Sequence, residues 1–427
     1  MKISNQWLRA TLETLYQGRS ATRSEIIANT GINPACISLT LQHLLTSGVL
    51  QKVGDLRSTG GRKREVLKLN SEAGYFVVVD LEASQVRFGL TNFLGDLRFR
   101  WEDLLAYGRG LDADRIAAGV QMVLRNLSPA ERGRVLAAGI SYTGTMDAQG
   151  RVNACNLGWS EFPLRERLDK ALGMPVFYGA ESFCKILAER WLGVAQDSRN
   201  CISVRVELGI GAGIFADGRL LKGHSGMAGE FGHITVDPAL PYRCNCGKTG
   251  CLETVASTPN MIRRYLERTG RADVAPQPAH FAELLGKARE GQPEALQVID
   301  CACRYLGLAL SHLVNVLNPQ LLVLGGDPVK GEDLFVPRIE VELRRHCLPA
   351  LLPELELRVS SLGDDVGLKG AASLAFREAL NHPQLLKRMT GPVLLEHAEK
   401  APRREKVPPR AAPSPRRRLT VTTSAGR

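Results

Sequence analysis

The chain has 427 residues, of which 44% are hydrophobic, enough for two or three domains with ordinary cores. It has no run of eighteen or more apolar residues and no signal-peptide stretch at its N-terminus, so we expect a cytoplasmic protein that does not cross a membrane. Its ten cysteines are scattered apart from one cluster, which argues against a disulfide framework.

The net charge of +11 is concentrated at the two ends of the sequence. Residues 1–70 contain ten Lys and Arg against four Asp and Glu, and residues 381–427 contain eleven against three. The segment between them is slightly acidic. This distribution favours a nucleic-acid-binding unit joined to a domain with another task, although basic ends can also serve solubility alone.

Residues 24–50 have the pattern of two short helices separated by a tight turn. Ser24 is the expected cap of the first helix, and Gly31 is its expected end. Asn33 and Pro34 then begin the second helix as cap and first-turn proline.

The second helix has one apolar stripe, formed at helical spacing by Ile37, Leu41 and Leu44. Its other face carries small or polar side chains. A helix, a glycine turn and such a second helix predict a helix-turn-helix unit whose second helix enters the major groove of DNA. This face shows no arginine that would read guanine, so we expect Ser38 and Gln42 to contact base edges.

Residues 49–70 alternate like a small β-hairpin and carry glycines and three basic residues at the turn. A winged helix-turn-helix would present Arg62 and Lys63 to phosphates or to a narrow minor groove. We therefore expect a double-stranded DNA operator as a partner. The predicted DNA-binding residues are Asn33, Ala35, Ser38, Gln42, Gly61, Arg62, Lys63 and Arg64.

From residue 75 onward, strand-like and helical segments alternate. Two successive α/β units of this kind predict a two-lobed domain with a cleft between the lobes. In chain order we expect three strands within 75–104, a helix near 112–127, a strand from 135, a helix near 181–194, a strand-rich block from 201, helices over roughly 259–317 and a buried strand at 320–326.

Residues 244–251 read CNCGKTGC, and the segment GEFGH ends at His233, eleven residues before the first of these cysteines. One imidazole and three thiolates make a closed tetrahedral ligand set for Zn²⁺, and the two glycines permit the tight turns that the spacing requires. Four protein ligands leave no position for an activated water, so we expect a structural metal. The predicted ligands are His233, Cys244, Cys246 and Cys251.

The segments GHSGMAGEFGHITVD and CNCGKTGCLE together resemble the sugar-site and zinc signature of the ROK family, a bacterial group of repressors, open reading frames and sugar kinases. NPQLLVLGG is similar to the family's C-terminal glycine segment, and the leading winged helix is similar to its repressor branch, the N-acetylglucosamine and xylose repressors. The resemblance covers about residues 1–380. It implies an α/β fold in which a winged helix-turn-helix precedes a two-lobed actin/hexokinase-like ROK domain with a zinc knuckle.

We accordingly expect a DNA-binding domain at 1–70 and an effector and dimerisation domain at 71–380. Residues 381–427 are rich in Pro and Arg and are expected to form a disordered basic tail. The resemblance also implies a sugar or sugar-phosphate effector. The residues at matching positions are Glu230, His233 and Glu253, and Asn156 is a further candidate.

Three motifs that a kinase of this family needs are altered. The phosphate loop DxGGT reads DLEAS at 80–84, which places Glu82 where it would repel a triphosphate. The catalytic pattern NDxN reads AESF at 180–183, which leaves Glu181 at the position of the general base. The second phosphate loop, GTGIGxG in the family, reads ELGIGAG from Glu207.

These losses argue against phosphoryl transfer and predict a DNA-binding transcriptional regulator without enzymatic activity. We expect a repressor of carbohydrate genes that acts as a homodimer or larger homo-oligomer. One alternative is a residual ATP-dependent sugar kinase that retains a DNA-binding head. Another is a regulator controlled by a protein partner, because the altered NDxN motif leaves open whether a free sugar binds.

Overall fold

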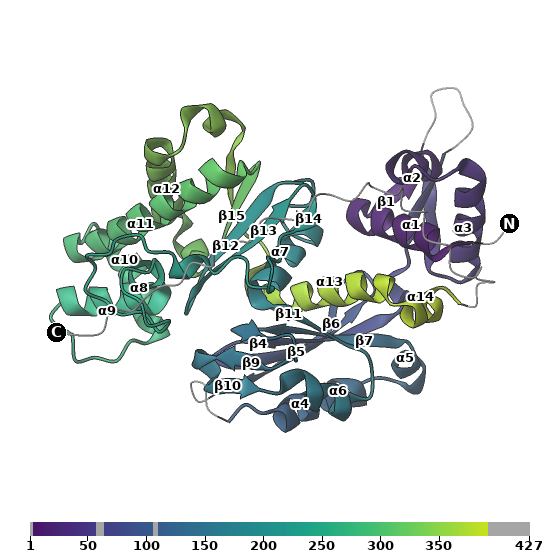
Figure 1. Ribbon diagram of the computed structural model, residues 1–427, viewed down its shortest axis with the longest axis horizontal. Helices are drawn as coiled ribbons and strands as arrows, with labels where there is room; N and C mark the ends of the chain where they lie inside the picture. Colours follow the sequence, from purple (N-terminus) through teal and green to yellow (C-terminus); the bar gives the residue numbers. More distant parts are fainter. Residues whose placement is uncertain (1–2, 57–63, 106–109, 392–427) are drawn as a thin grey trace, which may run out of the picture.

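The computed structural model describes residues 3–56, 64–105 and 110–391. An N-terminal unit leads into a body with two lobes (Figure 1). In this unit three helices pack on an antiparallel sheet of order β1-β3-β2. Its elements are α1 (Asn5–Gly18), β1 (Ser20–Thr22), α2 (Arg23–Thr30), α3 (Pro34–Thr46), β2 (Leu50–Leu56) and β3 (Arg64–Leu69).

The predicted helix-turn-helix is present, with one correction at its start. Thr22, not Ser24, caps α2: its hydroxyl accepts from the Glu25 N–H at 3.4 Å, and the Glu25 carboxylate accepts from the Thr22 N–H at 2.7 Å. Both residues can cap a helix, but only Thr22 has a glutamate three positions later. Gly31 ends α2 at φ 65°, and Asn33 caps α3 as expected.

Helix α1 was not predicted, and it supplies much of the unit's core. Leu8, Leu12 and Leu15 are fully buried, in one cluster with Ile37 and Leu44 of α3. These leucines are four and three residues apart, a spacing that is typical of a helix and could have predicted α1.

The first lobe is built on a five-stranded sheet of order β11-β7-β4-β5-β6, with an antiparallel meander at β4-β5-β6 and parallel pairing at β4-β7-β11. A small sheet of order β10-β9-β8 lies at its cleft side. The elements are η1 (Ser71–Ala73), β4 (Tyr75–Leu81), β5 (Gln85–Asn92), β6 (Leu97–Leu104), α4 (Ala113–Arg125), α5 (Pro129–Gly133), β7 (Val135–Tyr142), β8 (Thr145–Met146), β9 (Val152–Ala154), η2 (Cys155–Leu157), β10 (Trp159–Phe162), α6 (Leu164–Leu172) and β11 (Val176–Ala180).

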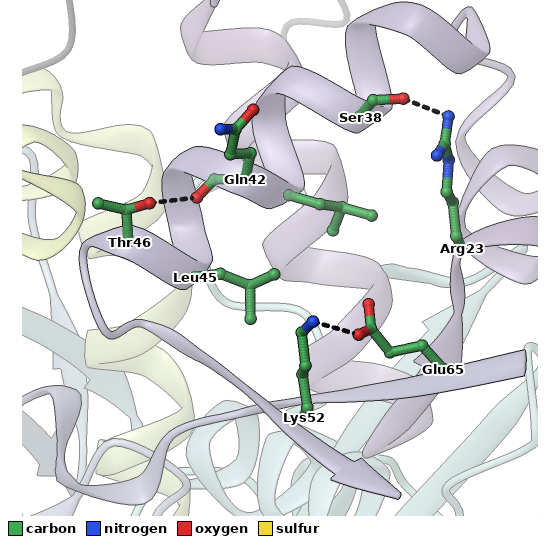
Figure 2. Close-up of a pocket in the computed structure, with 8 residues that line it drawn as sticks. Arg23, Ser38, Gln42, Leu45, Thr46, Lys52 and Glu65 are labelled. Carbon is green, nitrogen blue, oxygen red and sulfur yellow. Dashed lines mark hydrogen bonds and ion pairs between the residues drawn. The ribbon is translucent and has the colours of Figure 1, made fainter. Parts of the chain in front are cut away.

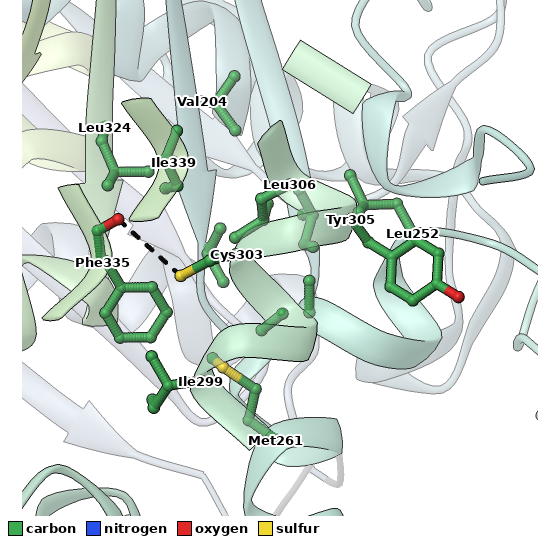
Figure 3. Packing of buried hydrophobic residues seen from close by; sticks show 14 of the residues in the cluster. Val204, Leu252, Met261, Ile299, Cys303, Tyr305, Leu306, Leu324, Phe335 and Ile339 are labelled. Atoms are coloured by element: carbon green, nitrogen blue, oxygen red, sulfur yellow. Dashed lines mark hydrogen bonds between the residues drawn. The ribbon is translucent and has the colours of Figure 1, made fainter. Parts of the chain in front are cut away.

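The second lobe has a sheet of order β14-β13-β12-β15-β16, covered by a group of helices. Figure 3 shows part of its core, in which Leu252, next to Cys251 in the chain, packs among side chains of the sheet and the helices. The elements are β12 (Cys201–Val206), β13 (Ile210–Ala216), β14 (Arg219–Leu220), η3 (Phe231–His233), α8 (Glu253–Ala256), α9 (Thr258–Arg268), α10 (Pro278–Arg289), α11 (Pro293–Leu317), β15 (Leu321–Gly326), η4 (Asp327–Gly331), α12 (Glu332–His346), η5 (Pro349–Glu354), β16 (Glu356–Val359) and η6 (Gly363–Asp365).

Two helices, α7 (Glu181–Trp191) and α13 (Val366–Asn381), lie between the two sheets (Figure 1). They cross closely, because a Cβ atom on Gly370 of α13 would lie 2.1 Å from the carbonyl oxygen of Cys184 in α7. Only glycine permits this approach. Helix α7 therefore touches both lobes.

The predicted start of the tail at residue 381 is wrong. Residues 383–390 form helix α14 (Pro383–Thr390), with Leu385, Leu386 and Met389 buried in the same cluster as the N-terminal unit. Their apolar face gives this segment enough buried surface to fold, despite its basic composition. Residues 392–427 lie outside the described part of the chain.

Aromatic stacking joins the N-terminal unit to the body. The Tyr16 ring of α1 lies between Trp191 at the end of α7 and Phe376 of α13, with ring centroids 4.0 and 3.9 Å away. The Arg19 guanidinium donates to the Trp191 carbonyl oxygen at 3.1 Å. The N-terminal unit therefore shares one core with the first lobe.

Among the described residues, none of the helices combines the length and apolarity needed to cross a bilayer.

Candidate functional site

A cleft of about 1170 Å³ separates the two lobes. The residues predicted to contact an effector all line it. Asn156 comes from η2 of the first lobe, whereas Glu230, His233 and Glu253 come from the second. A ligand bound between them would touch both lobes.

The four predicted metal ligands lie together at one end of this cleft. Their ligand atoms all lie within 4.8 Å of one another, with 3.5 Å between Cys244 Sγ and His233 Nδ1 and 3.6 Å between Cys246 Sγ and Cys251 Sγ. Tetrahedral Zn²⁺ with ordinary bond lengths requires nitrogen–sulfur and sulfur–sulfur edges of about 3.6 and 3.8 Å. The cluster is therefore consistent with a zinc site.

Backbone geometry holds this cluster in shape. Gly250 has φ 76°, and a Cβ there would lie 2.3 Å from the carbonyl oxygen of Asp237. The Lys248 ammonium donates to the His233 carbonyl oxygen at 2.9 Å. Because Leu252 is fully buried in the second lobe, the segment that carries the cysteines is anchored to a core.

Glu253 connects the cluster to the glycine-rich loop. Its Oε2 accepts from the backbone N–H of Ile210 at 3.2 Å, and its Oε1 lies 3.9 Å from Cys244 Sγ. A Cβ on Gly209 would lie 2.8 Å from this Oε2. Glu253 thus lies in the cleft as predicted, with one of its two oxygens already bonded to the protein.

A second part of the cleft contains a network of charges around Lys185, and we call it the phosphate end because the altered kinase motifs meet there. This lysine is 2% exposed, and its Nζ pairs with Glu181 one turn earlier in α7, with Glu207 at 2.7 Å and with Glu82 at 3.7 Å. Arg205 also pairs with Glu207, at 2.7 Å. The three glutamates that replace kinase residues therefore surround one ammonium group.

These contacts shift the ionisation of the network. Burial lowers the pKa of Lys185, but Glu181 and Glu207 outweigh burial and raise that pKa above its usual value. Burial likewise acts to raise the pKa of Glu207, but Lys185 and Arg205 hold it well below its usual range. The Lys185–Glu207 pair is therefore charged at neutral pH.

Asp80, the residue kept from the kinase motif DxGGT, is fully buried behind this network. Arg87 lies 3.7 Å from it but forms a closer pair with Glu82, at 2.9 Å. Burial and the Glu82 charge therefore raise the pKa of Asp80 to about 8. Asp80 thus carries a proton at neutral pH, unlike a carboxylate that binds a metal–nucleotide complex.

Helix α3 exposes Asn33, Ala35 and Gln42, as the helix-turn-helix prediction requires. Ser38 is less accessible: its hydroxyl donates to the Pro34 carbonyl oxygen at 2.6 Å and accepts from Arg23 of α2 (Figure 2). The predicted wing is present, with β2 and β3 paired antiparallel. The wing residues Gly61, Arg62 and Lys63 lie outside the described residues, and Arg64 begins β3.

Figure 2 also shows a groove of about 440 Å³ between α3 and the wing. Arg23 lines it together with Lys52 and Glu65 of the wing, which pair at 2.5 Å. Arg23 was not among the predicted DNA contacts, because it lies on the first helix of the motif. Arg23 lies at the start of α2, next to the beginning of α3, and this position indicates a residue that could contact DNA.

Two α/β lobes around a cleft with a His–Cys₃ cluster, preceded by a helix-turn-helix unit, define an ROK-type body with an added N-terminal head. The model of the ROK family matches residues 114–378, and the chain belongs to this family.

Relatives of two kinds share this body. A putative xylose repressor of Caldicellulosiruptor sp. is 27% identical over 387 residues, covering 87% of this chain and 96% of that protein. A glucokinase of Halalkalibacterium halodurans is 31% identical over 318 residues, covering 71% of this chain and 96% of that protein. The crystal structure of an ROK family transcriptional regulator, a homologue of the Escherichia coli MLC protein, matches with a TM-score of 0.74 at 26% identity and covers 90% of this chain and 99% of that chain.

Proposed function

We propose that this protein is a DNA-binding transcriptional regulator, a repressor of carbohydrate genes, whose ROK body senses a ligand and does not transfer phosphoryl groups. The proposal rests on one observation. A helix-turn-helix with an exposed second helix is joined to a body in which the charged side chains around Lys185 are paired with one another at the altered kinase motifs. The putative xylose repressor also aligns with a larger share of this chain than the glucokinase does.

The contacts of Glu181 support the proposed loss of catalysis. A general base must be free to accept the proton of a substrate hydroxyl. Here Glu181 forms an ion pair with Lys185, and Glu207 and Glu82 occupy the surroundings where a kinase binds phosphates. A nucleotide in this part of the cleft would therefore meet carboxylates that are already paired with Lys185.

The cluster of His233, Cys244, Cys246 and Cys251 would hold a structural Zn²⁺. When bound, the metal supplies a rigid cross-link, since four protein ligands leave it no open position. Its ligand His233 then presents a fixed ring to the cleft beside Glu230. Glu253 holds the glycine-rich loop against the same segment.

Helix α7 provides a physical route from the cleft to the DNA-binding unit. Glu181 and Lys185 lie near its first turn, and Trp191 at its end stacks on Tyr16 of α1. A ligand that favours one lobe angle would move α7 and with it the head. A hundredfold change in operator occupancy needs only about 2.7 kcal/mol of differential affinity.

A homodimer would place two heads on a palindromic operator, whose half-site spacing is set by the distance between the heads. Selection of binding sites from a random double-stranded DNA library tests this. The expected result is a palindromic site bound with salt-dependent affinity. Failure to enrich any site over several rounds would contradict the DNA-binding function.

The wing is tested on the selected site. Arg62→Ala should weaken binding and reduce the slope of log affinity against log salt by about one. Arg9→Ala is the matched control, because Arg9 lies on α1 and pairs with Glu13 at 3.2 Å. If the two variants bound DNA equally well, the wing would not be part of the DNA interface.

A residual sugar kinase is the second candidate, and the glucokinase relative and the carboxylate at position 181 favour it. The measurement is release of ADP with ATP, Mg²⁺ and a panel of hexoses. We expect no turnover above background. Turnover that disappears in Glu181→Ala would establish the kinase and overturn the proposed loss of catalysis.

A further inference from the structure

The charges of the cleft define which class of ligand it can take. We propose that the cleft binds a sugar that carries no anionic group, and that it excludes phosphorylated sugars and nucleotides. This inference rests on the proposed ligand-sensing function and deepens it, because the family resemblance leaves a sugar and a sugar phosphate equally open.

Every cationic side chain among the described residues that line the cleft is already paired with a carboxylate. Lys185 pairs with Glu181 and Glu207 in the network described above. The same holds for the four others, and their pairs are Arg87 with Glu82 at 2.9 Å, Arg205 with Glu207 at 2.7 Å, Arg289 with Asp333 at 2.7 Å and Lys330 with Asp327 at 2.8 Å.

Two backbone features that receive anions in other proteins are also occupied by carboxylates. In the glycine-rich loop, the N–H of Ile210 donates to Glu253 Oε2 at 3.2 Å. The N-terminus of α7 carries Glu181 in its first turn, which complements the positive end of the helix dipole. Each feature therefore has a carboxylate beside it that would repel an incoming phosphate.

Carboxylates outnumber cations on the walls of the cleft. Eight Asp and Glu residues line it, against five Lys and Arg. The excess includes Glu230, whose side chain is 54% exposed and lies beside His233. With Zn²⁺ bound, three thiolates and one divalent cation would add a further negative charge at this end.

A phosphate group in this cleft would have to take one cation from its carboxylate. At Lys185, Arg87 and Arg205, whose side chains are largely buried, that exchange leaves a carboxylate unpaired in a desolvated site, which is the costly case. The pairs of Arg289 and Lys330 are exposed, so solvent screens both the charge lost and the charge gained there. Sugar hydroxyls need no such exchange, since Glu230 and Asn156, which also line the cleft, offer an acceptor and an amide. We expect phosphorylated sugars to bind on the order of 100-fold more weakly than their parents.

The test is calorimetric titration of the zinc-loaded full chain with matched pairs of compounds. The pairs are glucose and glucose 6-phosphate, xylose and xylose 5-phosphate, and N-acetylglucosamine and its 6-phosphate. Binding of at least one parent sugar, with its phosphate much weaker, is the expected result. A phosphate that binds as tightly as its parent, or more tightly, overturns the inference and leaves ligand sensing in place. No binding by any compound refutes both the inference and sugar sensing, while DNA binding stands or falls by site selection.

A gain of binding supplies an independent check. Glu207→Gln removes the carboxylate shared by Lys185 and Arg205, which frees their charge for a ligand. The ratio of phosphate to parent affinity should then rise about tenfold. Glu283→Gln is the control, since it frees Arg271, which does not line the cleft. If thermal unfolding shows Glu207→Gln to be folded and the ratio matches that of the control, the pairing of charges does not determine the ligand class.

Discussion

The two ends of the cleft contain similar residue types but differ in whether these side chains are paired with one another. At the zinc end, Glu230 and Asn156 project into the cleft without an ionic partner other than the ring of His233. At the phosphate end, Lys185, Glu181 and Glu207 satisfy one another. The first end keeps polar groups available for a ligand, whereas at the second the charged side chains of the protein are paired with one another.

Under the proposed function, this contrast would explain how phosphoryl transfer can be lost without loss of structure. In a kinase, phosphate and metal charges balance each other between the lobes. In this chain the ammonium of Lys185 and the carboxylates of Glu82 and Glu207 provide that balance permanently. Glu82 belongs to the first lobe and Glu207 to the second, so the network also joins the lobes.

Removing a metal ligand should produce the largest effect at the zinc end. Cys251→Ser is expected to lower the zinc content from about one atom per chain to near zero and to cost on the order of 5 kcal/mol in unfolding free energy. The reason is that Cys251 is fully buried beside Leu252, so the core of the second lobe loses its anchor. Metal analysis and denaturant unfolding measure the two effects.

Cys155→Ser is the control for this substitution, because Cys155 is an exposed cysteine in the same cleft and lies outside the cluster. It should leave both the zinc content and the stability unchanged. Retention of zinc by Cys251→Ser, at the level of the control, would contradict the assigned ligand set.

At the phosphate end, Lys185→Met should be nearly as damaging. The substitution keeps the length of the side chain but leaves Glu181 without a cation and Glu207 with Arg205 alone. Breaking a buried pair by removing one partner costs about 3–5 kcal/mol. Denaturant unfolding at neutral pH measures this cost.

Lys330→Met provides the comparison, because Lys330 pairs with Asp327 at 2.8 Å while 67% of its side chain is exposed. An exposed pair contributes about 0–1 kcal/mol. If the two substitutions had equal effects, Lys185 would be an ordinary surface lysine and the phosphate end would not be a closed network.

The features predicted correctly from the sequence depend on residues that are close in the chain. Asn33 and Pro34 begin α3 through contacts within one turn, and the spacing of Cys244, Cys246 and Cys251 alone brings three thiolates together. The alternation of strands and helices likewise fixed the two α/β lobes. Such local signals need no knowledge of the tertiary structure.

The missed features depend on contacts between distant segments. Lys185 reads as a solvated residue in an amphipathic helix, and only the fold brings Glu207 of another strand to it. Helix α14 was assigned to the tail because its basic residues resemble those that follow, while its buried face is visible only against α13 and the head. Composition describes a window of sequence, whereas burial depends on what packs against it.

The buried carboxyl of Asp80 gives the phosphate end a pH dependence of its own. Because its pKa is raised to about 8, the folded chain keeps a proton that the unfolded chain releases above its ordinary pKa. The contribution of Asp80 to stability is therefore full at low pH, falls as pH rises toward 8 and is level above that.

Asp80→Asn removes this dependence while keeping the shape of the protonated side chain. The variant should equal the parent near pH 5 and exceed its stability by about 4 kcal/mol near pH 9, because each of the three pH units up to 8 contributes about 1.4 kcal/mol. Thermal unfolding across this pH range provides the measurement. A variant that is less stable than the parent at pH 9 would show that Asp80 is ionised and paired with Arg87.

The smallest expected effect distinguishes the closed network from its rim. Glu102 lies 3.9 Å from Arg87, and 54% of its side chain is exposed. Arg87 already has a closer partner in Glu82, at 2.9 Å, so Glu102→Gln should change the unfolding free energy by less than about 0.5 kcal/mol. A loss as large as that of Lys185→Met would show that the network includes Glu102 and extends to the surface of the protein.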